Sequence, residues 1–283
     1  MALVSMAKRK TRGPLSPLNR PGPPKDEAGK PQHYPAKPAI YYDRQLIALC
    51  KPMFADYLVE LSAVALEYKP ITEDASPTEV LRKTMDKLKR KFMALFEREA
   101  PRIADNVVGM IDKASAVSSD LSLKDTSARI TLKSKVPPSS INDHVRANVA
   151  LIKSIPDKYH EQIEKAVIKS VGPYGHGLQT ITDALMEYEG VTRRRAEFIA
   201  LDQTRKVTSQ LNAERVVKAG AKKFKWVHSG GGAHPRELHK FGLNGQIFEY
   251  ANLPIIDERT GERGLPGQLP NCKCIAQPIV EFD

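Results

Sequence analysis

The sequence predicts an α+β protein, with a mostly helical N-terminal part and a smaller C-terminal domain that combines helices with a small β-sheet. In the helical part, apolar residues recur at steps of three and four, which is the spacing of one helix face. Nearer the C-terminus, Phe224, Trp226 and His228 alternate on one face, which indicates a strand. The expected domains are a disordered basic arm over residues 1–39, a helical domain over 40–174 and a mixed domain over 175–283.

Charge and composition restrict the class of protein. The net charge of +11 and the pI near 9.5 suggest an acidic partner such as nucleic acid. The chain has no run of about 18 apolar residues and no continuous apolar segment near its start, so we expect neither a membrane protein nor a secreted one. Three cysteines without framework spacing predict a reducing compartment.

Residues 1–39 are rich in proline, lysine and arginine and hold few large apolar side chains. Such a segment buries too little surface to offset the entropy that is lost on ordering. We expect a disordered arm, or an extended arm that orders on a partner, and a plain linker is the alternative. Its candidate DNA-phosphate contacts are Lys8, Arg9, Lys10 and Arg12.

Two helices are expected next. The first begins near Asp43, is kinked at Pro52 and places Cys50 in its apolar stripe. The second begins at the segment SPTEV, in which Ser76 can cap the helix and Pro77 suits the first helical position.

The second helix has two contrasting faces. Its apolar stripe predicts the core side and consists of Leu81, Met85, Leu88, Phe92 and Leu95. Its basic side is either an ordinary solvated face or a DNA-binding surface. The candidate DNA contacts on that side are Arg82, Lys83, Lys87, Arg90 and Lys91.

The middle of the chain predicts a connection and then more helices. Residues 113–140 are polar and rich in small side chains, which indicates a connection with short elements. Helical spacing returns at Val145 and again from Pro156, and the glycine cluster 172–177 then breaks the chain. That cluster is interpreted as a helix end and turn, with a functional loop around His176 as the alternative.

Two more helices and three strands complete the prediction. A short helix is expected over residues 178–190, and a longer one over 192–219 ends at Gly220. The strand candidates are the segments KKFKWVHS, QIFEY after an Asn-Gly turn, and CKCIAQPIVEF.

Histidine and cysteine residues of the C-terminal domain predict a metal site. On a strand, Cys272 and Cys274 would point to the same face, so both sulfurs could reach one ion. Together with His239, and with His234 or His228 as a fourth ligand, they would satisfy tetrahedral zinc. Two alternatives remain: reduced cysteines packed beside hydrogen-bonded histidines, and a nucleophilic cysteine with His239 as base, oriented by Asn271 or Asp257.

The ordered motifs of the C-terminal third resemble the C-terminal domain of phage Mu F-like minor head proteins, the head morphogenesis family. The resemblance covers about residues 175–280 and rests on a helix that contains IALDQT, on Trp226, on the Arg236-x-x-His239 pair, on an Asn-Gly turn and on the closing NCKC. Leu201 and Lys273 stand where the family often has arginine, which is a departure from the pattern.

The resemblance implies a structural protein of a tailed-phage head. The expected partners are the portal protein, major capsid or scaffold proteins, and double-stranded DNA in nonspecific contact, with no membrane. The expected location is the virion, in the capsid interior or at the portal vertex, after assembly in the host cytoplasm. We expect no enzymatic activity. The alternatives are a metal-dependent nuclease or hydrolase acting on nucleic acid, and a host nucleic-acid-binding protein.

Overall fold

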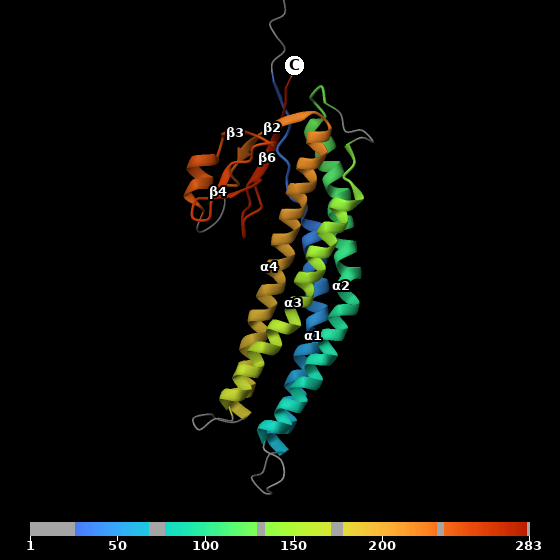
Figure 1. The fold of residues 1–283 in the computed structure, drawn as a ribbon, viewed down its shortest axis with the longest axis vertical. Helices are drawn as coiled ribbons and strands as arrows, with labels where there is room; N and C mark the ends of the chain where they lie inside the picture. The colour runs from blue at the N-terminus through green and yellow to red at the C-terminus, as the bar shows by residue number, and fades with distance from the viewer. Residues whose placement is uncertain (1–25, 68–76, 129–133, 171–177, 231–234, 282–283) are drawn as a thin grey trace, which may run out of the picture.

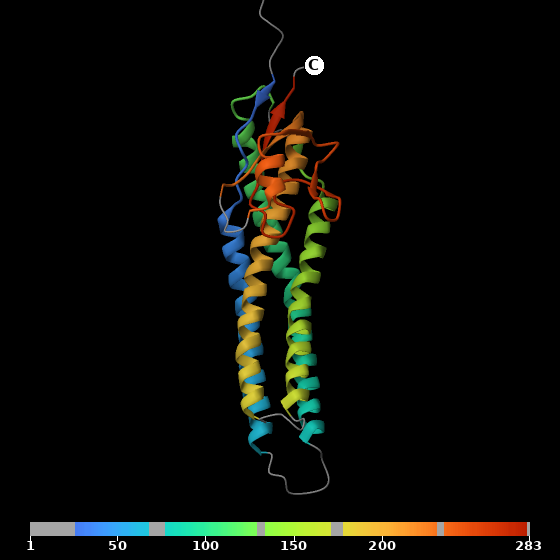
Figure 2. The same ribbon diagram turned by 90° about the vertical axis from the view of Figure 1, so that its left-hand side faces the viewer.

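The computed structural model describes residues 26–67, 77–128, 134–170, 178–230 and 235–281. Four long helices run side by side as an elongated bundle (Figure 1): α1 (Ala36–Glu67), α2 (Pro77–Leu123), α3 (Pro138–Ser170) and α4 (Leu178–Lys218). Helices α1 and α3 each pack against both α2 and α4. The strands gather beside one end of this bundle, next to the C-terminal end of α4 (Figures 1 and 2). The α+β prediction is confirmed.

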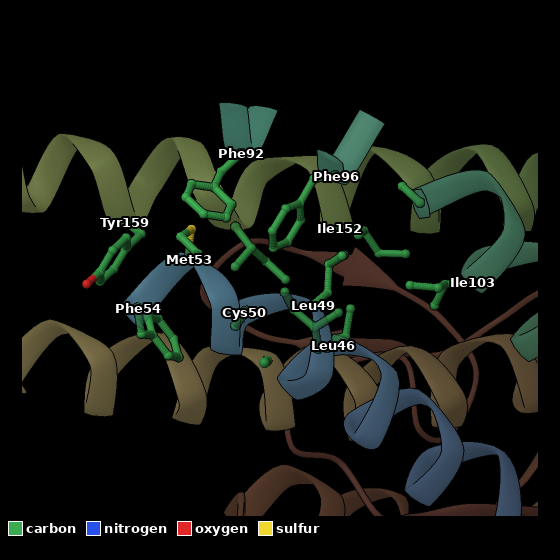
Figure 3. Close-up of a cluster of buried hydrophobic side chains, with 14 of the residues drawn as sticks. Leu46, Leu49, Cys50, Met53, Phe54, Phe92, Phe96, Ile103, Ile152 and Tyr159 are labelled. Carbon is green, nitrogen blue, oxygen red and sulfur yellow. The ribbon is translucent and has the colours of Figure 1, made fainter. Parts of the chain in front are cut away.

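The bundle core follows the apolar spacing of the sequence. In the predicted stripe of α2, Leu81, Met85, Leu88 and Phe92 are buried. Figure 3 shows Phe92 and Phe96 meeting side chains of α1 and α3 in this core. Cys50 lies in the same cluster as predicted, and burial raises the pKa of its thiol to about 12.

The helices are longer than predicted. Residues 113–123, expected in a connection, belong to α2, because three of the small polar side chains there are buried and partnered rather than exposed. Ser119 accepts a hydrogen bond from Gln32 at 3.1 Å, and Ser115 accepts one from Arg215 at 3.3 Å. The predicted break after residue 190 is also wrong: α4 continues through Gly190, since a glycine costs a helix about 1 kcal/mol and the buried turns on both sides outweigh it.

The predicted helix starts and breaks agree with the structure in part. Helix α2 begins at Pro77, as expected, and Pro52 lies inside α1. The two stretches of helical spacing around Pro156 form one helix, α3. Ser76 and the glycine cluster with His176 lie outside the described residues.

The strands form a four-stranded antiparallel sheet with the order β1-β6-β2-β3. Its strands are β1 (Glu27–Ala28), β2 (Ala221–Val227), β3 (Ile247–Glu249) and β6 (Ile275–Val280). A separate pair, β4 (Ile255–Asp257) and β5 (Glu262–Arg263), adjoins a π-helix, Leu238–Leu243. Phe224 and Trp226 of β2 are fully buried on one face, as the alternation predicts.

The N-terminal segment is part of the fold. Residues 26–39, assigned from the sequence to a disordered arm, contain β1 and the start of α1. Strand β1 pairs with β6. Gln277 donates a hydrogen bond to the carbonyl of Gly29 at 2.8 Å, although these two residues are 248 positions apart in the sequence. Residues 1–25 lie outside the described part of the chain. Among the helices that are described, none combines the length and the apolarity needed to cross a membrane.

Candidate metal centre

Three buried side chains from two separate segments of the C-terminal region meet. His239 lies on the π-helix Leu238–Leu243, and Cys272 and Cys274 lie just before β6. Their candidate ligand atoms are all within 4.8 Å of one another. Their exposed fractions are 3%, 4% and 3% in chain order. The three residues that the sequence predicts to converge therefore do so.

The cysteines reach the cluster by a route that the sequence does not predict. They were expected on a strand, but β6 begins only at Ile275, and both cysteines belong to the preceding loop. Asn271 adopts a φ of 59°, in the left-handed region that asparagine tolerates, and the amide of Cys272 donates to the carbonyl of Leu269 at 3.0 Å. A tight turn, and not strand alternation, brings both sulfurs to His239.

The imidazole of His239 is oriented for ligation. Its Nε2 lies 2.9 Å from the carbonyl oxygen of Ile256 in β4. Because a carbonyl oxygen only accepts, Nε2 carries a proton, and Nδ1 is the ring nitrogen that faces the sulfurs and can bind a metal in the neutral ring. Trp226 packs edge-on against the ring, with centroids 5.1 Å apart. Metal-bound histidines in proteins are commonly held by such a bond from the distal ring nitrogen.

The distances fit tetrahedral zinc. His239 Nδ1 lies 3.5 Å from Cys272 Sγ and 3.8 Å from Cys274 Sγ. In a tetrahedral site with Zn–S near 2.3 Å and Zn–N near 2.0–2.1 Å, nitrogen and sulfur ligands are separated by about 3.6 Å. Two cysteines and one histidine thus supply three ligands of suitable chemistry and spacing.

The cysteine pair favours a negative charge at this place. The hydrogen bond from the Cys274 thiol is the main cause that lowers the pKa of Cys272 to about 4, against the opposing effect of burial. The same hydrogen bond, with burial, raises the pKa of Cys274. Burial lowers the pKa of His239, but hydrogen bonds to Cys272 and to the Ile256 carbonyl outweigh it, so that this pKa is raised. The lowered pKa of Cys272 favours a thiolate among three buried groups, and a bound cation would stabilise that charge.

The loop that carries the cysteines is fastened by the N-terminal segment. The Tyr34 hydroxyl lies within hydrogen-bond distance of the carbonyls of Cys274 and Pro266. Gly267 has a φ of +87°, and a Cβ there would lie 2.0 Å from the Tyr34 oxygen. The backbone N–H of Gly267 also lowers the pKa of Cys272 by hydrogen bonding. Sequence patterns did not identify Tyr34, Gly267 or the Ile256 carbonyl as parts of the site.

The other predicted ligands are not in the described cluster. His234 lies outside the described residues. His228 is not a member of the cluster, and its Nδ1 accepts a hydrogen bond from the amide of Gly230 at 3.0 Å. Arg236 donates to the carbonyl of Pro270 at 3.0 Å, so the Arg-x-x-His pair binds the cysteine loop at two points.

The geometry does not support the nucleophilic-cysteine alternative. A carbonyl, and not Asn271 or Asp257, orients His239. The Asp257 carboxylate instead accepts the amide of Arg259 at 3.0 Å. A thiol–imidazole pair without an orienting carboxylate or amide side chain lacks the third member that such catalysis usually uses.

The predicted DNA contacts fall into two groups. Lys8, Arg9, Lys10 and Arg12 lie outside the described residues. On α2, ion pairs join Lys83 to Glu79 at 2.7 Å, Lys87 to Glu60 at 2.8 Å, and Lys91 to Asp56. Ion pairs thus neutralise three of the five candidates on α2, and among the described residues Arg82 and Arg90 have no ion-pair partner.

Comparison with known proteins agrees with the resemblance. Residues 161–277 match the family model described as phage Mu protein F like protein, and this range contains the whole His239, Cys272 and Cys274 cluster. An uncharacterized protein of Haemophilus influenzae (strain Rd) is 32% identical over 141 residues, which are 50% of this chain and only 30% of that relative. No solved structure matches the chain.

Proposed function

We propose that this chain is a minor head protein of a tailed double-stranded DNA phage. The match of residues 161–277 to the phage Mu protein F like family carries the proposal. The matched range includes α4, strands β2 and β3 of the sheet, the start of β6 and the His/Cys cluster. In the proposed role the protein joins the head during assembly, near the portal, beside major capsid or scaffold proteins.

Residues His239, Cys272 and Cys274 hold a structural zinc ion in this proposal. Three observations support it: the near-tetrahedral spacing of the ligand atoms, the proton placed on Nε2 of His239, and the low pKa of Cys272. Zinc when bound would cross-link the π-helix to the cysteine loop. His234, four residues before Leu238, remains the proposed fourth ligand.

The geometry favours a structural role over the metal-dependent nuclease alternative. The three ligands are almost completely buried, and in the described part of the chain the cluster includes no carboxylate. A hydrolytic zinc needs an open position for water and room for the substrate. We therefore propose that the protein has no catalytic turnover on DNA.

Nonspecific DNA contact is proposed from charge. The chain carries a net charge of +11, and phosphate contacts need no base recognition. Affinity for duplex DNA should then fall with salt, with a slope of log K against log salt of about −0.9 for each neutralised phosphate. Removal of residues 1–25 should flatten that slope without changing base preference. An unchanged slope would exclude phosphate contacts by this segment.

The head assignment is tested on particles. Heads are purified from a phage lysate of the source strain, with and without the gene, and their proteins are identified by mass spectrometry. We expect peptides of this chain in heads of the wild type, and fewer mature heads after deletion. Finding the chain only outside particles, with unchanged head yield, would refute the assignment. A dependence of its incorporation on the portal gene would support the portal-vertex location.

A further inference from the structure

A groove of about 400 Å³ runs between α3 and α4, and none of the residues of the His/Cys cluster lines it. We call it the α3–α4 groove. Its cationic lining consists of Lys158, Arg194 and Arg195, and its large apolar lining consists of Ile155, Val191 and Phe198. The argument for a ligand rests on this combination and does not depend on the proposed head function or on zinc.

Helical geometry explains why these residues share one surface. Ile155 and Lys158 are three positions apart on α3, and Val191, Arg195 and Phe198 follow one another at steps of four and three on α4. Residues spaced in this way lie along one helix face. Since α3 and α4 pack against each other, the two stripes border the same groove.

The charge of the groove is not balanced. No aspartate or glutamate lines it, and within the described residues none of its three cations forms an ion pair. The neighbouring acids have ion-pair partners outside the groove: Glu161 pairs with Lys165 at 2.7 Å, and Asp157 lies 3.7 Å from Lys89. The charge of Lys158 contributes only a smaller part of the lowered pKa of Glu161, after Lys165. The α2 basic face differs, because three of its lysines have carboxylate partners.

Arg195 is held in place with a donor left over. Its Nη2 donates to the hydroxyl of Ser154 on α3 at 3.1 Å, which fixes the guanidinium across the groove. Its Nε is buried and has no hydrogen-bond partner among the described residues. A buried donor without a partner costs free energy, and Arg195 keeps its charge beside the groove without a carboxylate partner among the described residues, so a ligand carboxylate can pair with it.

The apolar floor separates two classes of anionic ligand. Phe198 remains 38% exposed, and Leu201, one turn further along α4, is exposed to the same extent. Duplex DNA presents phosphates and needs no apolar floor. A protein segment can place an apolar side chain beside carboxylates, which matches an apolar floor with a cationic rim.

We propose that the α3–α4 groove binds an acidic segment of a partner protein. An apolar side chain of that segment packs on Val191 and Phe198, and its carboxylates pair with Lys158, Arg194 and Arg195. The site is a docking surface that shares no residue with the His/Cys cluster.

The test uses the full chain and a labelled peptide that repeats Glu-Glu-Leu, followed by fluorescence anisotropy. A peptide that repeats Glu-Glu-Ser has the same charge without the apolar side chains. The variant Lys158→Glu/Arg194→Glu should weaken binding of the first peptide by about tenfold or more, since both charges face the ligand. Phe198→Ala should weaken it as well. The charge-matched control is Arg44→Glu/Lys51→Glu, which changes two exposed cations of α1 outside the groove.

Each outcome decides for or against the proposal. It is supported if both groove variants weaken the leucine peptide while the control does not, and if the serine peptide binds more weakly. It is overturned if the control weakens binding equally, because net charge alone then explains the interaction. It is also overturned if the groove variants weaken only duplex or single-stranded DNA of the same label. Circular dichroism melts establish that each variant is folded. Lys158, Arg194 and Phe198 are exposed, so their substitution leaves the core intact.

Discussion

Nε2 of His239 lies 2.9 Å from the carbonyl oxygen of Ile256, and this contact sets the direction of the whole imidazole. The opposite ring atom, Nδ1, is thereby turned toward both cysteine sulfurs. One side chain consequently connects the π-helix, β4 and the cysteine loop. The small domain has few long strands, so such a cross-link matters more to its stability than it would in a large core.

The zinc proposal predicts the metal content and its effect on stability. Purified protein should contain about one zinc per chain, because the two cysteines and the histidine form one site. Removal of the metal by a chelator should lower Tm by roughly 5–10 °C, since the ion binds the folded chain only. Elemental analysis and thermal unfolding measure both quantities. Protein without zinc that melts at the same temperature before and after chelation would support the packed-core alternative.

Matched variants separate ligation from folding. His239→Ala and Cys272→Ser should each abolish stoichiometric zinc binding, because a zinc site loses most of its affinity when one of its protein ligands is removed. His228→Ala is the control, since His228 lies outside the cluster and should leave the zinc content unchanged. Full zinc content in both cluster variants would contradict the assignment.

The bundle should lose stability in mild acid through His160. Its Nδ1 lies 2.9 Å from the Tyr57 hydroxyl. Burial is the main cause that lowers the pKa of His160, and the positive charge of Lys89 lowers it further. Glu164 and other nearby acids act in the opposite direction but do not outweigh these two causes. The unfolded chain then binds more protons than the folded one below about pH 6.5, so the free energy of unfolding decreases as pH falls through this range. Above that value both states are neutral and the effect vanishes.

The variant His160→Gln tests this dependence, because glutamine can bond to Tyr57 and does not titrate. Urea unfolding is measured between about pH 5 and pH 8 for both proteins. We expect the wild type to lose more stability than the variant at the acidic end. Parallel curves would show that His160 does not titrate differently in the two states.

Gly267 should be the least replaceable glycine near the candidate metal centre. Gly267→Ala places a Cβ 2.0 Å from the Tyr34 oxygen at a φ of +87°, so both a clash and backbone strain arise. We expect a loss of about 2–4 kcal/mol in the free energy of unfolding and weaker zinc binding. The control is Gly109→Ala in α2, where the added Cβ meets nothing within 4 Å and the helix should gain about 0.5–1 kcal/mol. Equal effects at the two sites would exclude the proposed crowding.

Apolar spacing predicted the bundle core and strand alternation predicted the buried face of β2, because both patterns report which side faces away from water. The main error of the sequence-based prediction concerned polar residues that are buried. Ser115 and Ser119 look like loop residues in the sequence, yet Arg215 and Gln32 satisfy them inside the fold. Their partners are 87 or more positions away, and no local pattern carries that information.

The candidate metal centre was predictable by residue type and not by geometry. Histidine and cysteine are recognisable in the sequence as metal-binding residue types. The group that orients His239 is the backbone carbonyl of Ile256, and every residue has such a group. The role of Tyr34 could not be predicted either, since this residue lies 240 positions from Cys274 and within a segment whose composition indicates disorder. Chain topology, which places β1 beside β6, is what unites them.

The contact between α4 and α2 near the sheet gives the last prediction. Arg215 Nη2 lies 2.5 Å from an oxygen of Asp112, and Nη1 lies 3.3 Å from the Ser115 hydroxyl. The arginine side chain is 6% exposed but the aspartate is 35% exposed, so removal of the arginine leaves a carboxylate that water can still reach. Arg215→Met should therefore cost about 1–3 kcal/mol, less than the roughly 3–5 kcal/mol expected when a fully buried charge loses its partner. The double variant Arg215→Met/Asp112→Asn should recover part of that loss, because the uncompensated charge is gone. Lys165→Met, which breaks the exposed Lys165–Glu161 pair, is the control and should change stability little. Urea unfolding followed by circular dichroism measures all three, and a control loss as large as that of Arg215→Met would show that burial does not set the strength of the α2–α4 pair.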